Sequence, residues 1–400
     1  MSITSSRPSL RAPGDLAAAR LAALRNSFRA AGPSLALYLA IRSLGLVVLA
    51  LWSASTGKSA HVLLSRRWDS LWYTRVAEHG YDFTLQAPDG RSLSGMAFFP
   101  LLPWLEEGLS AVSPLGLPDA GLVVSALASV AAAWGIHAVA SHVHGPRAGL
   151  VLVGLWAALP VGIVQSMAYS ESLFAALAVW SLHAVLTGRW ITAGLLSVLA
   201  GLTRPVGLAV CAALLVAALL VTVDSLRSRR RLPDSVAAMA VGCAIAPLGA
   251  AGFVLWVGQR QGRLLGYLDV QAGWGNGFDG GVAFARFLSS FSRFSHAGVV
   301  TAVVVVLLFL LAAWPHWIGV RQGQPVALVV YSAVVTLLAL GASGYFGSKP
   351  RLLMPAFPLL LPLAVVLARS RPAYLWATLT ALTAVGAVYG AFWLNGSGPL

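Results

Sequence analysis

Long apolar stretches alternate with short polar turns along most of this 400-residue chain. Each stretch is about 20 residues long, enough for one helix to cross a hydrocarbon layer of about 30 Å. Since a helix satisfies its own backbone groups inside lipid, the pattern predicts an all-α polytopic membrane protein with about eleven transmembrane helices. The predicted spans are residues 34–55, 118–141, 148–166, 170–187, 190–203, 205–223, 236–257, 298–318, 326–344, 352–368 and 373–394.

These spans divide the chain into a basic N-terminal segment (1–33), a transmembrane domain (34–394) and a short tail (395–400). Within the transmembrane domain, two long loops cover residues 56–117 and 258–297. Arginine crowds into the N-terminal segment and into short loops at helix ends, so the positive-inside rule predicts that these are cytoplasmic. Both long loops then lie on the outer face. Loops of this length in a compact protein are usually functional.

Composition excludes several classes of protein. Hydrophobic residues make up 58% of the chain and charged residues only 10%, against about 25% charged in soluble domains. The net charge of +14 is scattered between apolar runs and forms no basic stripe, so nucleic-acid binding is not predicted. Arginine far exceeds lysine and alanine is abundant, which indicates a GC-rich bacterial genome and favours the bacterial plasma membrane.

No metal or cofactor site is indicated. The two cysteines, Cys211 and Cys243, fall inside predicted spans and provide neither a disulfide framework nor a zinc site. A glycine-rich loop of the nucleotide-binding type is absent from the sequence. A site for a soluble nucleotide-sugar or for ATP is therefore not indicated.

The first long loop contains a helical pattern that runs from Arg67 and is closed by Gly80. Asp69 and Tyr73 are spaced to share one face of this helix, with Trp68 and Trp72 on the neighbouring face. A carboxylate held at the lipid interface could act as a general base. In the alternative interpretation, which is equally compatible with the sequence, this is an interfacial helix whose aspartate caps the N-terminus.

Three short polar insertions interrupt the later apolar runs, at residues 169–172, 203–205 and 348–351. In the predicted topology all three lie at outer helix ends. Taken singly, an ionisable residue there would simply reach toward water. Together they bring one carboxylate and three cations to the same face, namely Glu171, Arg204, Lys349 and Arg351. The second long loop adds polar and aromatic residues, including Gln271 and Trp274, that could bind a sugar or a headgroup or could form a solvated loop.

Several of these motifs, in their order and spacing, resemble a known family. Arg67-Trp68-Asp69, Ala77-Glu78-His79-Gly80-Tyr81 and Ala97-Phe98-Phe99-Pro100 resemble the first luminal loop of the PIG-V family, the GPI mannosyltransferase that adds the second mannose. Tyr169-Ser170-Glu171-Ser172, and Arg204 followed by Gly207, fall where the next motifs of that family lie. Pro205-Val206 departs from the Asn-Gly of many eukaryotic members. The later half matches loosely, through Gln271, Trp274 and residues 351–358.

The resemblance implies a bacterial member of the C-type (GT-C) membrane glycosyltransferases, with a catalytic aspartate in the first outer loop, here Asp69. The implied reaction transfers mannose with inversion from a polyprenyl-phosphate donor in the membrane to a glycan, lipid or protein acceptor, without a metal cofactor. A small membrane partner subunit would be compatible with this role. Arg204, Lys349 and Arg351 are expected to bind the donor phosphate. The residues expected to contact substrate are Trp68, Trp72, Tyr73, His79, Glu171, Gln271 and Trp274.

Two other classes remain open at the level of sequence. A secondary transporter would have a similar number of spans, but its binding residues would lie near the midplane, often within internal repeats. A non-catalytic protein of envelope assembly would keep its function when Asp69 is replaced by Asn.

Overall fold

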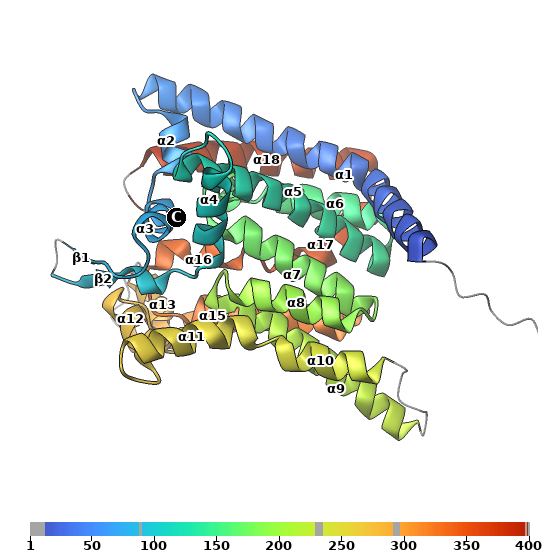
Figure 1. Ribbon diagram of the computed structural model, residues 1–400. Helices are drawn as coiled ribbons and strands as arrows, with labels where there is room; N and C mark the ends of the chain where they lie inside the picture. The colour runs from blue at the N-terminus through green and yellow to red at the C-terminus, as the bar shows by residue number, and fades with distance from the viewer. Residues whose placement is uncertain (1–12, 88–89, 229–234, 291–296, 397, 399–400) are drawn as a thin grey trace, which may run out of the picture.

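The computed structural model describes residues 13–87, 90–228, 235–290, 297–396 and 398. Long helices lie side by side in a single bundle (Figure 1). Its α-helices (α), 3-10 helices (η) and strands (β) follow in the order α1 (Pro13–Ser55), α2 (Ala60–Ser65), α3 (Asp69–His79), β1 (Thr84–Gln86), β2 (Ser92–Ser94), η1 (Gly95–Ala97), α4 (Leu101–Ala111), α5 (Leu117–His144), α6 (Pro146–Ala157), η2 (Pro160–Ser166), α7 (Ser170–Leu186), α8 (Trp190–Gly201), η3 (Pro205–Gly207), α9 (Leu208–Arg227), α10 (Val236–Ile245), α11 (Leu248–Arg260), α12 (Gly266–Gly273), α13 (Val282–Ser289), α14 (Ala297–Arg321), α15 (Val326–Gly341), η4 (Phe346–Ser348), α16 (Lys349–Leu353), η5 (Phe357–Leu360), α17 (Leu361–Arg369) and α18 (Pro372–Asn395).

The helices have the length and apolar character of an integral membrane protein. In the described part of the chain, five helical segments are long and apolar enough to cross a membrane, or up to seven if each of two bent pairs is counted as one span. Helix α1 begins at Pro13, so much of the predicted N-terminal segment is continuous with the first apolar helix. Every predicted span coincides with helical structure, which confirms the all-α class. The number of spans stays a prediction.

Prolines bend two of the predicted spans. Helix α6 ends at Ala157, and the chain turns by 88° into η2 at Pro160. Around Pro355, the chain turns by 77° between α16 and the η5–α17 helix pair. Proline lacks a backbone donor and clashes with the preceding helical turn, so both breaks follow from the sequence. Each of these two predicted spans is therefore formed by helices that meet at a sharp angle.

Small residues allow close packing between helices. A Cβ added at Gly194 on α8 would lie 2.5 Å from the carbonyl oxygen of Gly242 on α10, and one at Gly249 on α11 would lie 1.9 Å from that of Val198. These contacts let helix backbones approach each other closely, as is typical inside lipid, where the hydrophobic effect does not drive helices together. Elsewhere α5 packs against α6 and α7, and α1 packs against α18.

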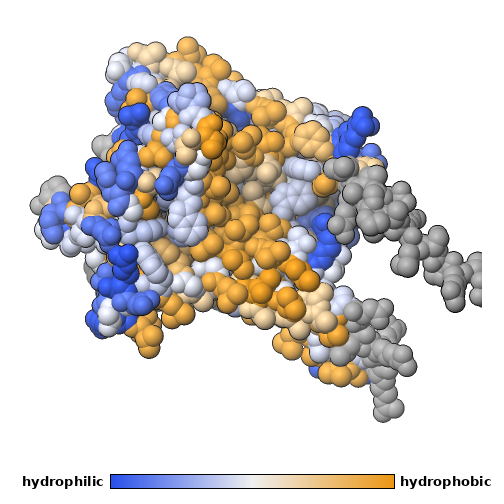
Figure 2. All heavy atoms as spheres, viewed as in Figure 1, coloured by the Kyte–Doolittle hydropathy of each residue, from blue (hydrophilic) through white to orange (hydrophobic). Residues whose placement is uncertain are grey.

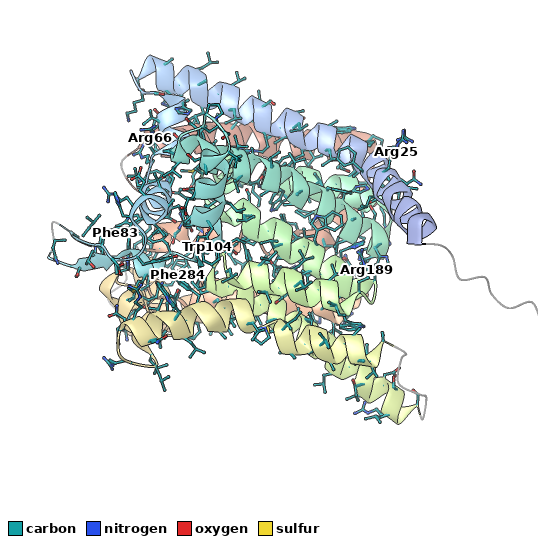
Figure 3. The ribbon with its side chains drawn as sticks, in the orientation of Figure 1. Arg25, Arg66, Phe83, Trp104, Arg189 and Phe284 are labelled. Carbon is teal, nitrogen blue, oxygen red and sulfur yellow. The ribbon has the colours of Figure 1, made fainter. Side chains whose placement is uncertain are left out.

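We call the end of the bundle that carries α2, α3, the β1–β2 hairpin and α12 the loop end. Hydrophilic residues gather there, while a broad hydrophobic band covers the middle of the visible face (Figure 2). Arg25 and Arg189, both predicted to be cytoplasmic, lie at the end opposite Arg66 and Phe83 (Figure 3). These residues therefore lie at opposite ends of the bundle, and the side of the membrane that each end faces stays a prediction.

Candidate active site

Asp69 is the first residue of α3, directly after a strained turn. Trp68 has φ 53°, and among the described residues it is the only non-glycine with positive φ. The hydroxyl of Ser70 closes this turn, donating to the carbonyl of Arg67 over 2.6 Å and accepting from its amide over 2.8 Å. The Arg67 guanidinium in turn donates to the carbonyls of Leu394 and Gly396 at the end of α18. The conformation before Asp69 is thus held from two sides.

The carboxylate of Asp69 does not cap its own helix. Trp68 occupies the N-cap position without a side-chain capping bond, and the Asp69 Oδ2 atom lies 2.9 Å from Nη1 of Arg351. The side chain of Asp69 remains 26% exposed, so a substrate can reach it. Its backbone amide donates to the hydroxyl of Tyr169 over 3.3 Å. The capping interpretation of this aspartate is therefore wrong.

Residues at the start of α7 contribute buried polar groups to the site. Glu171, in the first turn of α7, is only 1% exposed. The hydroxyl of the neighbouring Ser170 lies 2.7 Å from the Tyr73 hydroxyl and accepts from Nη1 of Arg204 over 3.2 Å. Burial raises the pKa of Tyr73, so its hydroxyl stays neutral and serves as a hydrogen-bonding group.

Arg204 is fixed by the residues that follow it. Pro205 favours extended backbone at the preceding residue, and Arg204 has φ −160° and ψ 152°. A Cβ at Gly207 would lie 2.6 Å from the Cα of Gly201, so glycine permits the tight turn between α8 and α9. This turn directs Nη1 of Arg204 to within 2.5 Å of Glu171 Oε1.

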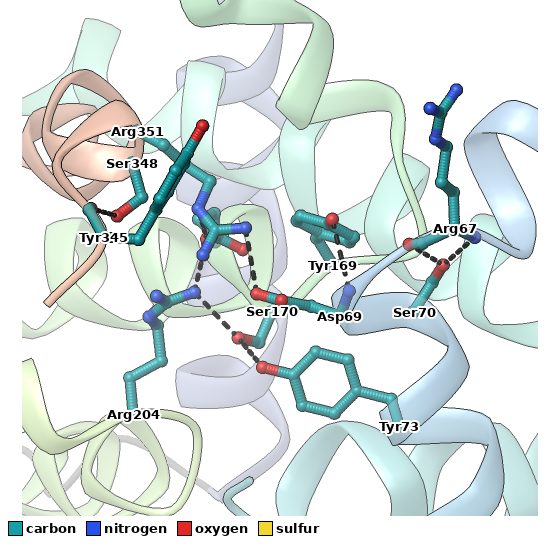
Figure 4. Close-up of polar contacts among 11 residues, drawn as sticks. Arg67, Asp69, Ser70, Tyr73, Tyr169, Ser170, Arg204, Tyr345, Ser348 and Arg351 are labelled. Atoms are coloured by element: carbon teal, nitrogen blue, oxygen red, sulfur yellow. Dashed lines mark hydrogen bonds and ion pairs between the residues drawn. The ribbon is translucent and has the colours of Figure 1, made fainter. Parts of the chain in front are cut away.

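Arg351 contacts the same carboxylate oxygen, and Figure 4 shows its guanidinium group near Asp69 and Arg204. The segment after it is anchored because Trp156 Nε1 donates to the carbonyl of Met354 over 3.1 Å. Nε of Arg351 lies 3.2 Å from Glu171 Oε1, while its guanidinium carbon lies 5.2 Å from the centre of the Tyr169 ring. Asp69, Glu171, Arg204 and Arg351 together form what we call the charge cluster. Its two negative and two positive charges cancel.

The contacts inside the charge cluster are ion pairs without good hydrogen-bond alignment. Among the described residues, neither oxygen of Glu171 has a hydrogen-bond partner, and neither Nε nor Nη1 of Arg351 has one. The Arg351 side chain is nevertheless only 9% exposed. Buried donors of this kind are normally satisfied, and here Nη1 and Nε of Arg351 are paired with the carboxylates of Asp69 and Glu171 at ion-pair distance.

Lys349 does not join the charge cluster. Its Nζ donates to the carbonyl of Ala339 over 2.7 Å and also to that of Ala342, at the end of α15. The same ammonium lies 5.4 Å and 5.6 Å from the ring centres of Phe284 and Phe346. In this conformation Lys349 caps a helix and does not face Asp69.

Three other predicted substrate residues join the two long loops to each other. The Trp72 ring lies 5.5 Å from that of Phe98 and 4.6 Å from that of Trp274. Trp274 Nε1 donates to the carbonyl of Ser94 over 3.1 Å, and Gln271 Nε2 donates to the Tyr267 hydroxyl over 2.8 Å. Gln271 Nε2 also donates to the carbonyl of Ala97 over 3.5 Å, so all three side chains connect the two long loops.

Two further predicted substrate residues lie apart from one another. Trp68 precedes α3, so the helical face that it was predicted to share with Trp72 is not formed. His79 is exposed at the opposite end of α3, which ends before Gly80 as predicted, and lies 3.6 Å from Glu78.

Tyr169 and Ser170 were not among the residues predicted for the site. Both belong to the same polar insertion as Glu171 and to the same family-like motif, and these two signals in the sequence could have identified them. In the described residues no group of three or more His, Cys, Asp or Glu side chains is arranged to hold a metal ion, and Arg351 already pairs with both acidic side chains of the cluster. Independence from metal stays a prediction.

Comparisons with solved structures define the fold class. The chain has the all-α fold of the C-type membrane glycosyltransferases. It is similar to ArnT from Cupriavidus metallidurans bound to undecaprenyl phosphate, with a TM-score of 0.52 and 16% identity, covering 86% of this chain and 62% of that one. A second similar structure is the archaeal oligosaccharyltransferase AglB from Archaeoglobus fulgidus in complex with an inhibitory peptide and a dolichol-phosphate, with a TM-score of 0.49, 12% identity and coverage of 91% and 56%. The chain spans less than two thirds of either structure. It matches no protein-family model and no curated protein.

Proposed function

We propose that the chain is a membrane glycosyltransferase that moves a sugar from a polyprenyl-phosphate donor to an acceptor hydroxyl with inversion. One observation carries the proposal: a partly exposed carboxylate, Asp69, pairs with Arg351, which shares Glu171 with a second largely buried arginine from a distant part of the chain, Arg204. A base beside an anion-binding site is what this reaction requires. The similar ArnT structure contains undecaprenyl phosphate, which supports a lipid phosphate as the donor.

The reaction is a single displacement. Asp69 accepts the proton of the acceptor hydroxyl while that oxygen attacks the anomeric carbon. The bond between the anomeric carbon and the phosphate oxygen breaks, and its electron pair leaves with the phosphate. The products are the glycosylated acceptor and a polyprenyl monophosphate.

The leaving phosphate gains a second negative charge as the bond breaks, so it needs nearby positive charge more than it needs a proton. Arg204 and Arg351 supply this charge at a site where both are largely buried. Preorganised cations act strongly in such places, because they interact with the developing charge without having to reorganise. Of the three predicted phosphate ligands, these two are therefore proposed for the role.

Mannose is the sugar that we propose, on the basis of the motifs that resemble the PIG-V family. We also propose that the loop end faces the outer side of a bacterial plasma membrane, since the arginine-rich short loops favour the opposite side as cytoplasmic. The acceptor is a hydroxyl group on an envelope glycan, lipid or protein.

The test uses purified protein in nanodiscs with radiolabelled polyprenyl-phosphate-mannose and an acceptor extract from envelopes of a deletion strain. We expect Asp69→Asn to lower turnover by roughly 10²–10⁴-fold, as for loss of a general base. Asp82→Asn is the matched control, because Asp82 lies in the same long loop with a side chain that is 76% exposed. Wild-type turnover in Asp69→Asn would exclude the proposed base. Equal use of polyprenyl-phosphate-glucose would exclude mannose specificity and leave the reaction class intact.

A further inference from the structure

Glu171 is the most deeply buried member of the charge cluster. Its side chain is 1% exposed, which leaves almost no surface for a sugar hydroxyl. The same oxygen, Oε1, lies 2.5 Å from Nη1 of Arg204 and 3.2 Å from Nε of Arg351. A single buried atom is therefore shared by the two cations that the reaction needs.

The carboxylate of Glu171 offsets the repulsion between the two arginines. They come from separate segments, the turn after α8 and the short helix α16. Like charges at this separation repel each other strongly when they are largely removed from water. Because Glu171 pairs with both, it converts two mutually repelling guanidinium groups into one preorganised site.

Arg351 is held differently from Arg204, because it contacts two carboxylates. Its Nε faces Glu171, and its Nη1 faces Asp69 at 2.9 Å. Neither nitrogen has an aligned hydrogen bond among the described residues. A phosphate with several oxygens would match the planar guanidinium better than two separate carboxylates do. The contact with Asp69 is thus the one that an incoming phosphate can replace.

We propose that Glu171 is a positioning residue that anchors Arg204 and Arg351, so that Arg351 can exchange Asp69 for the donor phosphate without leaving the site. This inference rests on the proposed function. In the absence of donor, Arg351 neutralises Asp69. When the donor binds, the guanidinium turns its Nη1 to the phosphate and releases Asp69 to accept a proton. No covalent bond changes in this exchange, and the base becomes free only when a donor is present.

The net charge of the charge cluster distinguishes a positioning role of Glu171 from a direct contact between Glu171 and the sugar. The charge cluster is neutral in the wild type, and Glu171→Gln makes its net charge +1. A phosphate should then bind at least as well as before, although the two arginines are no longer correctly placed for the transition state. Turnover should fall while affinity does not. If Glu171 instead held a sugar hydroxyl, its loss would weaken donor binding.

The experiment compares wild type, Glu171→Gln and Glu171→Asp in nanodiscs, with undecaprenyl phosphate as the binding probe and polyprenyl-phosphate-mannose as the donor. Glu107→Gln is the control, because it changes an exposed acid on α4 outside the cluster. We expect Glu171→Gln to lower kcat by roughly 10²-fold, the scale of losing one preorganised contact, with unchanged or tighter probe binding and no rise in KM for the donor. Glu171→Asp keeps the charge on a shorter stem and should recover part of kcat.

Four results would overturn the inference. One is a rise in donor KM of tenfold or more at unchanged kcat in Glu171→Gln, which would indicate direct contact with the sugar. Another is a parallel loss of probe binding, turnover and thermal stability in both variants, which would indicate a structural role. If Glu171→Gln does not fold, Glu171→Asp carries the test, and a kcat equal to that of wild type would contradict the inference. If the wild type transfers no sugar, the proposed function fails, and probe binding still decides the inference: weaker binding in Glu171→Gln would contradict it.

Discussion

Replacing Arg351 with lysine keeps the charge but changes the geometry of the charge cluster. Arg351 uses two different nitrogens, Nη1 toward Asp69 and Nε toward Glu171. Lysine has a single nitrogen and must lose one of the two contacts. The net charge of the cluster stays zero, so we expect little change in the affinity for undecaprenyl phosphate.

The expected loss appears in turnover, because the contact to the leaving phosphate strengthens only as the glycosidic bond breaks. Removing one such preorganised donor typically costs about 3–4 kcal/mol in the transition state, or roughly 10²–10³-fold in kcat. Steady-state kinetics with polyprenyl-phosphate-mannose, over a range of donor concentrations, would separate kcat from KM.

Arg260→Lys provides the matched control, since Arg260 is a half-exposed arginine of the loop end that pairs with Asp82. Its turnover should match that of wild type. If Arg351→Lys turns over within about twofold of wild type, the guanidinium geometry is not used, and Arg351 then acts at most as a point charge.

Three further predictions concern stability and topology. Lys349→Met should lower thermal stability, because the Nζ of Lys349 donates hydrogen bonds to carbonyls at the end of α15. The kcat per folded molecule should stay near that of wild type. A loss of kcat as large as that of Arg351→Lys would instead show that Lys349 acts at the phosphate site. Burial raises the pKa of Glu106 from 4.5 to about 9. Between these two pH values the folded protein keeps a proton that the unfolded chain releases. The free energy of unfolding is therefore highest below pH 4.5 and falls as the pH rises toward 9. The thermal-inactivation temperature should therefore fall less between pH 6 and pH 9 in Glu106→Gln than in wild type, because glutamine does not titrate. An equal fall in both proteins would contradict this role of Glu106. Single cysteines at Ser94 and Ser228 should be labelled from opposite sides of the membrane, and labelling of both from outside would refute the topology.

Some site residues could be predicted because their signals are local. Glu171, Arg204 and Arg351 are ionisable residues that interrupt apolar runs, where burial without a partner would be costly. Asp69 was predicted from the helical pattern of the first long loop and from the resemblance of its motif to that of a known family. Tyr73 was predicted from its helical spacing to Asp69, and in the structure it contacts Ser170, which bonds to Arg204. Lys349 was predicted with the same logic and lies elsewhere, because residues two apart on a helix point in different directions. The five-residue helix α16 sends Arg351 to the charge cluster and Lys349 to the end of α15.

The sequence by itself determined the class of the protein, since runs of this length and apolarity have few stable arrangements other than membrane helices. It did not place the helix breaks at Pro160 and Pro355, because residues 148–166 and 352–368 were predicted as unbroken spans, although proline accounts for both breaks. Only the tertiary structure decided that Arg351 pairs with both Asp69 and Glu171, and that Trp72, Gln271 and Trp274 join the two long loops. These contacts link residues far apart in the chain, and such pairings depend on how helices pack, which the pattern within each segment does not encode.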